Sequence, residues 1–258
     1  MDLTDAYENG AYIPDAASYP LRWAAEAEAF RAQLGERARL DLPYGDDVRH
    51  RFDLFLPAGE VAGLLIFIHG GYWLKFDKSH WSHLAKGAIS RGWAVAMPSY
   101  RLAPDVRITD ITQDIAAAVV AACAEVEGPV VVAGHSAGGH LTARMACMDL
   151  AASKRIKRYV PISPISDLRP LMQTAMNAQL KIDATEAEAE SPVFLMPNGD
   201  VTVWVGAEER PAFLDQALWL SDAWKCRSRV APGRHHFDVI EEMALSESSL
   251  SRALLDGL

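Results

Sequence analysis

The hydrophobic pattern of the chain changes near residue 60, where alternating apolar positions give way to continuous apolar runs. Five such runs follow, most of them without polar residues at alternate positions. They are GLLIFIHG (63–70), GWAVAMPSY (92–100), PVVVAGHS (129–136), RYVPISP (158–164) and VTVWVGA (201–207). Strands that are apolar on both faces belong in a sheet covered on both sides. A later strand is expected at 226–232.

The segments between these runs have helical patterns. Helices are expected at 80–90, 108–126, 138–152, 211–224 and about 246–257. Strands that alternate with helices predict an α/β fold, in which a mostly parallel central sheet has right-handed crossovers and helices on both faces.

Two elements precede the parallel part. The pattern of residues 18–34 predicts an amphipathic helix that opens at Ser18. The side expected to be apolar carries Leu21, Ala24, Ala25 and Ala29. Residues 38–57 alternate between apolar and polar on either side of a Gly-Asp-Asp turn, which predicts an antiparallel hairpin.

No shift in composition marks a second domain, so residues 1–258 are expected to form one domain. Region 167–191 interrupts the alternation of strands and helices with short helical segments rich in alanine and charged residues. We expect this region to form a small helical cap over a site at the end of the sheet.

A serine occupies the bend after the third apolar run. Residues 134–138 read G-H-S-A-G, with a predicted strand before them and a predicted helix after them. In that context the pattern is typical of a nucleophile elbow, which holds the Ser136 hydroxyl at the carboxyl end of the sheet. The N–H of Ala137 then lies at a helix N-terminus, where developing negative charge is stabilised.

The first apolar run ends in His69-Gly70-Gly71, followed by Tyr72 and Trp73. The two glycines leave backbone N–H groups uncovered, and such donors stabilise the oxyanion of a carbonyl under attack. Together with Ala137, Gly70 and Gly71 are therefore the expected oxyanion hole. His69 is better explained as a residue that stabilises the turn than as a base.

These motifs resemble those of the α/β-hydrolases, and in particular of the kynurenine formamidase (arylformamidase) group and related bacterial esterases. The resemblance rests on HGGYW (69–73) and GHSAGGH (134–140), with further similarity at 5–16, 99–104, 206–217 and 235–242. It implies an α/β-hydrolase fold and a Ser-His-acid triad in the order serine, acid, histidine.

The base and the acid follow from that order. His235 and His236 lie after the last predicted strand, and the resemblance places the base at His236. The acid should follow the strand at 201–207, where Glu208 and Glu209 both qualify. The resemblance favours Glu209, although related sequences usually carry aspartate there. Weaker candidates for the acid are Asp167, Asp200 and Asp215.

The resemblance implies a serine hydrolase that cleaves N-formylkynurenine-like aryl formamides, as in tryptophan catabolism. Tyr72, Trp73 and His135 are assigned to substrate binding, and Tyr72 and Trp73 could instead belong to the core. The first alternative is a carboxylesterase or thioesterase of short acyl esters that uses the same machinery. A catalytically silent binding protein of this fold and a metal-dependent formamidase are further alternatives.

Composition narrows the class of partner. The net charge of −9 argues against nucleic acid or an anionic membrane, which leaves a small-molecule substrate. The three cysteines, Cys123, Cys147 and Cys226, are too few and too widely spaced for a disulfide framework or a zinc site, and no cofactor is expected. No apolar leader or bilayer-length stretch is present, so a cytoplasmic location is expected. Whether the chain forms a homodimer stays open.

Overall fold

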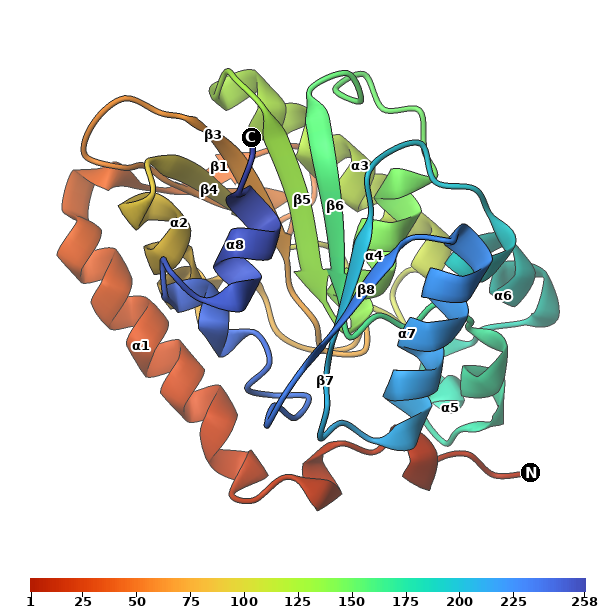
Figure 1. Ribbon diagram of the computed structural model, residues 1–258. Coiled ribbons are helices and arrows are strands. Elements are labelled where there is room, and N and C mark those ends of the chain that lie inside the picture. The colour runs from red at the N-terminus through yellow and green to blue at the C-terminus, as the bar shows by residue number, and fades with distance from the viewer.

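The computed structural model describes residues 1–258 and contains a single eight-stranded sheet flanked by helices (Figure 1). The strands are β1 (Ala38–Pro43), β2 (Arg51–Phe55), β3 (Gly63–Ile68), β4 (Trp93–Pro98), β5 (Val130–His135), β6 (Ile156–Ile162), β7 (Thr202–Gly206) and β8 (Arg227–Ala231). Their order in the sheet is β1-β2-β4-β3-β5-β6-β7-β8. The pairs β1–β2 and β2–β4 are antiparallel, and all later pairs are parallel. The predicted hairpin and the mostly parallel sheet are both confirmed.

The α-helices lie in two layers, one on each face of the sheet (Figure 1). They are α1 (Tyr19–Leu34), α2 (Lys86–Ser90), α3 (Ile108–Glu125), α4 (Ala137–Ala146), α5 (Asn177–Leu180), α6 (Ala184–Glu190), α7 (Pro211–Trp224) and α8 (Ser249–Leu255). Helices α3, α4 and α7 pack on one face, and α1, α2 and α8 pack on the other. Short 3-10 turns occur at 5–7, 10–12, 16–18, 35–37, 78–80, 82–85, 169–173, 192–194 and 241–244.

The middle of the sheet has a core on both sides. Every residue of β3, β4 and β5 is buried, so these strands need apolar side chains on both faces. In β3, Leu64 and Ile66 point to the face covered by α3, α4 and α7, whereas Leu65 and Phe67 point to the opposite face. This arrangement explains the uninterrupted apolar runs in the sequence.

Local sequence explains where several helices begin. Helix α7 begins at Pro211, a position where the missing N–H of proline has no consequence. The hydroxyl of Ser248 accepts a hydrogen bond from the N–H of Ser251 at 3.0 Å and caps α8. The carboxylate of Asp110 accepts from the N–H of Arg107 at 3.0 Å, which closes the first turn of α3.

Two expectations about helices are wrong. Helix α1 buries Trp23, Ala27, Phe30 and Leu34, not the side that carries Leu21, Ala24, Ala25 and Ala29. Leu21 is 76% exposed, because two aromatic rings and Leu34 bury more apolar area than a row of alanines. The expected helix over 138–152 ends at Ala146, whose carbonyl accepts a hydrogen bond from the N–H of Asn198 at 2.7 Å.

Candidate active site

Ser136 lies in the sharp turn between β5 and α4. Its φ of 57° and ψ of −116° are unusual for a residue with a side chain. The turn also requires a residue without a side chain at Gly138, where an added Cβ would lie 2.0 Å from the carbonyl oxygen of Ile68. The strained turn therefore presents the Ser136 side chain at the carboxyl end of the sheet.

Three loops bring Ser136, His236 and Glu209 together, although these residues are far apart in the sequence. His236, in the loop after β8, places Nε2 3.0 Å from Oγ of Ser136. Its Nδ1 donates to Oε2 of Glu209, in the loop after β7, at 2.6 Å. All three residues are at most 6% exposed, so little water competes for these hydrogen bonds. This geometry is the one that a serine nucleophile, a histidine base and an orienting acid require.

The second carboxylate oxygen of Glu209 is held by the scaffold. Oε1 accepts from the N–H of Gly206 at 2.9 Å and from the hydroxyl of Ser163, which lies directly after β6. Ser163 is not among the site residues predicted from the sequence. Its only sequence signal is a polar residue directly after an apolar strand.

The alternative triad residues lie elsewhere. Glu208 is exposed, and the carboxylate of Asp167 pairs with the guanidinium of Arg169 at 2.6 Å. Asp200 pairs with Arg227, and Asp215 is exposed. The other histidine of the pair, His235, places Nε2 3.1 Å from the hydroxyl of Tyr19.

Gly70 and Gly71 line the same cavity as Ser136, and Ala137 directly follows Ser136 at the start of α4. The N–H groups of these three residues donate to no acceptor within the chain, so they are free to bind an oxyanion. Gly71 has a φ of +117°, and an added Cβ would lie 2.4 Å from the carbonyl oxygen of Lys75. The turn before it is supported by His69, whose Nδ1 lies 2.8 Å from the carbonyl oxygen of Gly70.

His135 lies beside the base. Its ring centroid is 4.6 Å from that of His236, and the residue is 4% exposed. Burial, together with the neighbouring His236, holds the pKa of His135 well below its usual value. A neutral His135 adds no second positive charge next to an imidazolium that forms on His236.

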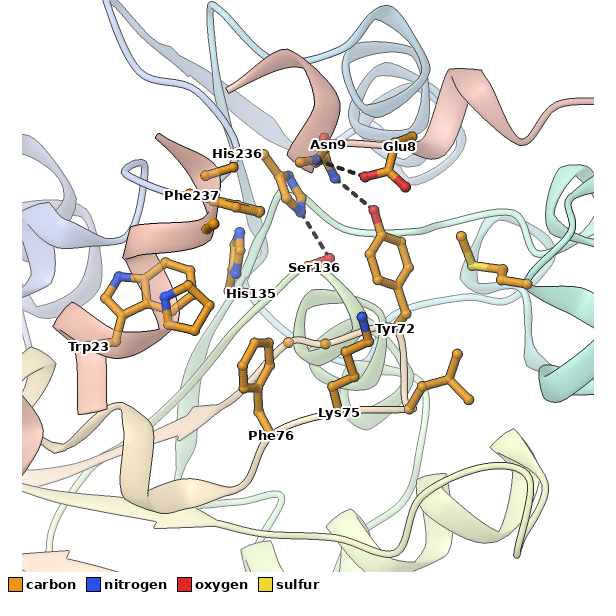
Figure 2. Close-up of a pocket in the computed structure, with 18 of the residues that line it drawn as sticks. Glu8, Asn9, Trp23, Tyr72, Lys75, Phe76, His135, Ser136, His236 and Phe237 are labelled. Atoms are coloured by element: carbon orange, nitrogen blue, oxygen red, sulfur yellow. Dashed lines mark hydrogen bonds between the residues drawn. The ribbon is translucent and has the colours of Figure 1, made fainter. Parts of the chain in front are cut away.

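Ser136 and His236 open onto a cavity of about 590 Å³ with aromatic walls (Figure 2). Its aromatic lining residues are Trp23, Tyr72, Phe76, Trp81 and Phe237. The N-terminal arm forms part of the wall through Glu8, Asn9, Gly10, Ala16 and Ala17. Met176 and Gln179, from region 167–191, also line the cavity, which agrees with a cap in that region. The cap and the single domain both stay predictions.

Tyr72 joins the N-terminal arm to the glycine turn. Its hydroxyl donates to the carbonyl oxygen of Tyr7 at 2.6 Å. The same hydroxyl accepts from Nδ2 of Asn9 at 2.8 Å (Figure 2). Burial raises the pKa of Tyr72, so the phenol stays protonated. Through this hydrogen bond Asn9 holds the side chain of Tyr72 in place as part of the cavity wall.

Trp73 does not line the cavity, contrary to its assignment to substrate binding. It is fully buried and packs edge-on against the ring of His140, with centroids 5.1 Å apart. Tyr72 and Trp73 both have a left-handed backbone, with φ values of 55° and 58°, and only the side chain of Tyr72 lines the cavity.

No group of three or more histidine, cysteine, aspartate or glutamate side chains is arranged to hold a metal ion. Among the helices, none combines the length and the apolar character needed to span a bilayer.

Comparisons with known proteins agree with this architecture. A family model described as the alpha/beta hydrolase fold matches residues 65–197, more than half of the chain. The kynurenine formamidase of Salmo salar is 29% identical, over 85% of this chain and 84% of that protein. The kynurenine formamidase of Drosophila melanogaster is 30% identical, over 83% of this chain and 79% of that protein.

The crystal structure of a protein described as a "putative thioesterase" from Silicibacter sp. TM1040 has a TM-score of 0.97 and 59% identity, over 98% of this chain and 99% of that one. The fold and the relatives agree with the resemblance seen in the motifs. The chain belongs to the α/β-hydrolase family and is a hydrolase that is similar to the kynurenine formamidases.

Proposed function

We propose that the protein is a serine hydrolase that forms an acyl-enzyme, and that its substrates are aryl formamides similar to N-formylkynurenine. The observation that carries this proposal is the continuous hydrogen-bonded chain from Ser136 through His236 to Glu209 at the base of an aromatic cavity. The similarity to two kynurenine formamidases supports the substrate class.

Acylation follows from the geometry. Nε2 of His236 takes the hydroxyl proton of Ser136 as Oγ attacks the formyl carbon. The carbonyl oxygen becomes an oxyanion and accepts hydrogen bonds from the free N–H groups of Gly70, Gly71 and Ala137. When the intermediate collapses, the C–N bond breaks and His236 gives its proton to the departing arylamine nitrogen.

Deacylation repeats these steps with water. His236 takes a proton from the water molecule, whose oxygen attacks the formyl carbon of the ester on Ser136. Collapse breaks the bond to Oγ, returns the proton to Ser136 and releases formate. Throughout, Glu209 fixes the imidazole tautomer and stabilises the imidazolium.

The shape and lining of the cavity support an aryl substrate. Aromatic side chains from α1, the glycine turn and the loop after β8 surround the opening to Ser136, and aromatic rings pack well against one another. A volume of about 590 Å³ exceeds that of a single aromatic ring, so the arylamine can carry a further substituent.

A thioesterase or short-chain esterase is the second candidate. The observation that favours it is the 59% identity to the protein described as a "putative thioesterase". The same nucleophile, base and N–H donors would serve a thioester or an oxygen ester, because each route passes through an acyl ester of Ser136. The two candidates therefore differ in the acyl group and in the leaving group.

Kinetics on three substrates separates these candidates. We would measure kcat/KM for N-formylkynurenine, p-nitrophenyl acetate and a short acyl thioester, and divide each value by the rate constant of uncatalysed hydrolysis. The expected result is the largest ratio for N-formylkynurenine. A larger ratio for either ester would overturn the formamidase proposal and leave the serine mechanism in place. Ser136→Ala protein is the blank for all three substrates.

The proposed mechanism uses only side chains and backbone N–H groups. Activity should therefore survive prolonged dialysis against a chelator. Loss of activity that is recovered when a divalent metal is restored would overturn this mechanism in favour of a metal-dependent one.

A further inference from the structure

Lys75 is the only lysine or arginine whose side chain lines the cavity. Its side chain extends toward the space between Ser136 and Tyr72, and no hydrogen bond joins its ammonium group to another side chain of the cavity (Figure 2). The walls around it are largely apolar and aromatic. Lys75 itself is exposed and has no ion-pair partner, so its positive charge is available to an anionic ligand that enters the cavity.

The backbone of residues 71–76 fixes the place of Lys75. The N–H groups of Leu74 and Lys75 both donate to the carbonyl oxygen of Gly71, at 3.0 and 3.1 Å. Tyr72, Trp73 and Phe76 have φ values of 55°, 58° and 71°, a left-handed conformation that residues with side chains rarely adopt. Backbone strain of this kind is concentrated at functional sites.

This strained loop directs its side chains to different places. Trp73 enters the core, whereas Tyr72, Lys75 and Phe76 line the cavity. Because the same loop carries the free N–H of Gly71, the backbone of Lys75 keeps a fixed position relative to the proposed oxyanion hole. The ammonium group therefore reaches into the cavity from a fixed attachment point near Ser136.

Glu8 is the only aspartate or glutamate on the cavity lining, and it lies on the N-terminal arm, beyond Tyr72 from Lys75 (Figure 2). Its Oε1 accepts a hydrogen bond from the N–H of Gly10 at 2.9 Å. The carboxylate of Glu8 and the ammonium group of Lys75 therefore lie at different parts of the cavity lining. An anionic substituent is attracted at Lys75 and repelled at Glu8, so the cavity selects its orientation.

We infer that Lys75 binds an anionic group on the leaving-group half of the substrate. This inference rests on the proposed function, because a formyl group carries no charge and the anion must then lie on the arylamine. The substrate class is narrowed to aryl formamides that carry a carboxylate or a similar anion. Lys75 is accordingly a specificity-determining residue.

The test uses substrates that differ only in one carboxylate. The formamide pair is 3-formamidobenzoate and formanilide, and the ester pair is 3-acetoxybenzoate and phenyl acetate. For each pair, the readout is kcat/KM of the anionic substrate divided by kcat/KM of the neutral one. Wild-type protein should favour the anionic member, and Lys75→Met should lower the ratio about threefold, as expected for an ion pair that water reaches.

Two further variants complete the test. Lys75→Arg keeps the positive charge and should restore most of the ratio. Lys154→Met makes the same change at an exposed lysine before β6, at the opposite end of the sheet, and should leave the ratio at its wild-type value. The wild-type ratio should also fall as salt is raised from about 0.02 to 0.5 M, because salt screens the attraction.

An unchanged ratio in Lys75→Met would overturn the inference, as would an equal fall in Lys154→Met. Failure of the proposed function gives a different result. If the protein cleaves esters but no formamide, the ester pair still reports the ratio, so the role of Lys75 is decided independently of the formamidase activity.

Discussion

Oε2 of Glu209 lies 2.6 Å from Nδ1 of His236. Glu209 follows β7, and His236 follows β8, which is the neighbouring strand of the sheet. The other oxygen of the carboxylate is fixed by the N–H of Gly206 and the hydroxyl of Ser163. Glutamate has one more methylene group than aspartate, and these two donors hold the longer side chain in a single position.

Glu209→Gln should therefore lower kcat by about 10³–10⁴, because an amide can no longer hold the imidazole in the required tautomer. Steady-state kinetics on the preferred substrate measures the effect, and circular dichroism verifies that the variant is folded. Glu208→Gln is the matched control, since Glu208 is exposed and adjacent in sequence. If the control lost activity while Glu209→Gln kept it, the acid would be misassigned.

Asn9 and Tyr72 should act as one unit. Asn9→Ala removes one hydrogen bond to the Tyr72 hydroxyl, and Tyr72→Phe removes that hydroxyl altogether. Each change should lower the free energy of unfolding by about 1 kcal/mol and raise KM, because the arm then holds the cavity wall less firmly.

The double variant should lose less free energy of unfolding than the two single variants lose together, since both changes break the same hydrogen bond. Urea denaturation and KM measure the coupling. Tyr12→Phe removes only an exposed hydrogen bond to Asp5 within the same arm, and it should change both quantities less than Tyr72→Phe does. Full additivity would mean that the hydrogen bond seen between Asn9 and Tyr72 does not form in solution.

Buried histidines make the fold sensitive to acid. Burial lowers the pKa of His69 and His140 to about 4, whereas both titrate near 6.5 when the chain is unfolded. Between these two values the unfolded state binds more protons. The contribution of each histidine is therefore complete above pH 6.5 and is lost as the pH falls toward 4.

The free energy of unfolding should fall steadily between pH 6.5 and 4, by up to about 3 kcal/mol per histidine. Urea denaturation at a series of pH values measures this fall. His140→Gln should flatten this slope, because glutamine does not titrate and can still donate to the carbonyl oxygen of Glu190 that Nε2 of His140 now contacts at 2.8 Å. An unchanged slope in the variant would contradict the explanation.

The sequence predicts best those features that local pattern controls. Continuous apolar runs identified the strands that are buried on both faces, and the glycines around Ser136 identified the strained turn. The order serine, acid, histidine left Glu208 or Glu209 as the acid and His235 or His236 as the base, and the family resemblance favoured Glu209 and His236. The structure places these two residues within hydrogen-bonding distance of each other.

The sequence predicts poorly those features that depend on contacts between distant segments. The buried side of α1 was misassigned because Trp23 packs on Trp81, 58 residues later, with ring centroids 4.7 Å apart. Trp73 follows Tyr72 directly, yet two consecutive left-handed residues send their side chains to different places. No periodic pattern encodes that conformation.

The contact of Ser163 with Glu209, and the positions of Glu8 and Lys75 on the cavity lining, were missed for the same reason. Each of these residues lies in a loop, and its surroundings depend on which other loop it faces. Only the fold brings the N-terminal arm against the glycine turn and the end of β6 against Glu209.

The central claim is that Ser136 is a nucleophile activated by His236, and covalent labelling tests it most directly. Intact-mass measurement after brief exposure to a fluorophosphonate should show one adduct per chain, and peptide mapping should locate it on Ser136. Ser136→Ala should remain unlabelled, and His236→Ala should react at a small fraction of the wild-type rate. An adduct on another residue, or equal labelling rates in the wild type and His236→Ala, would contradict the account.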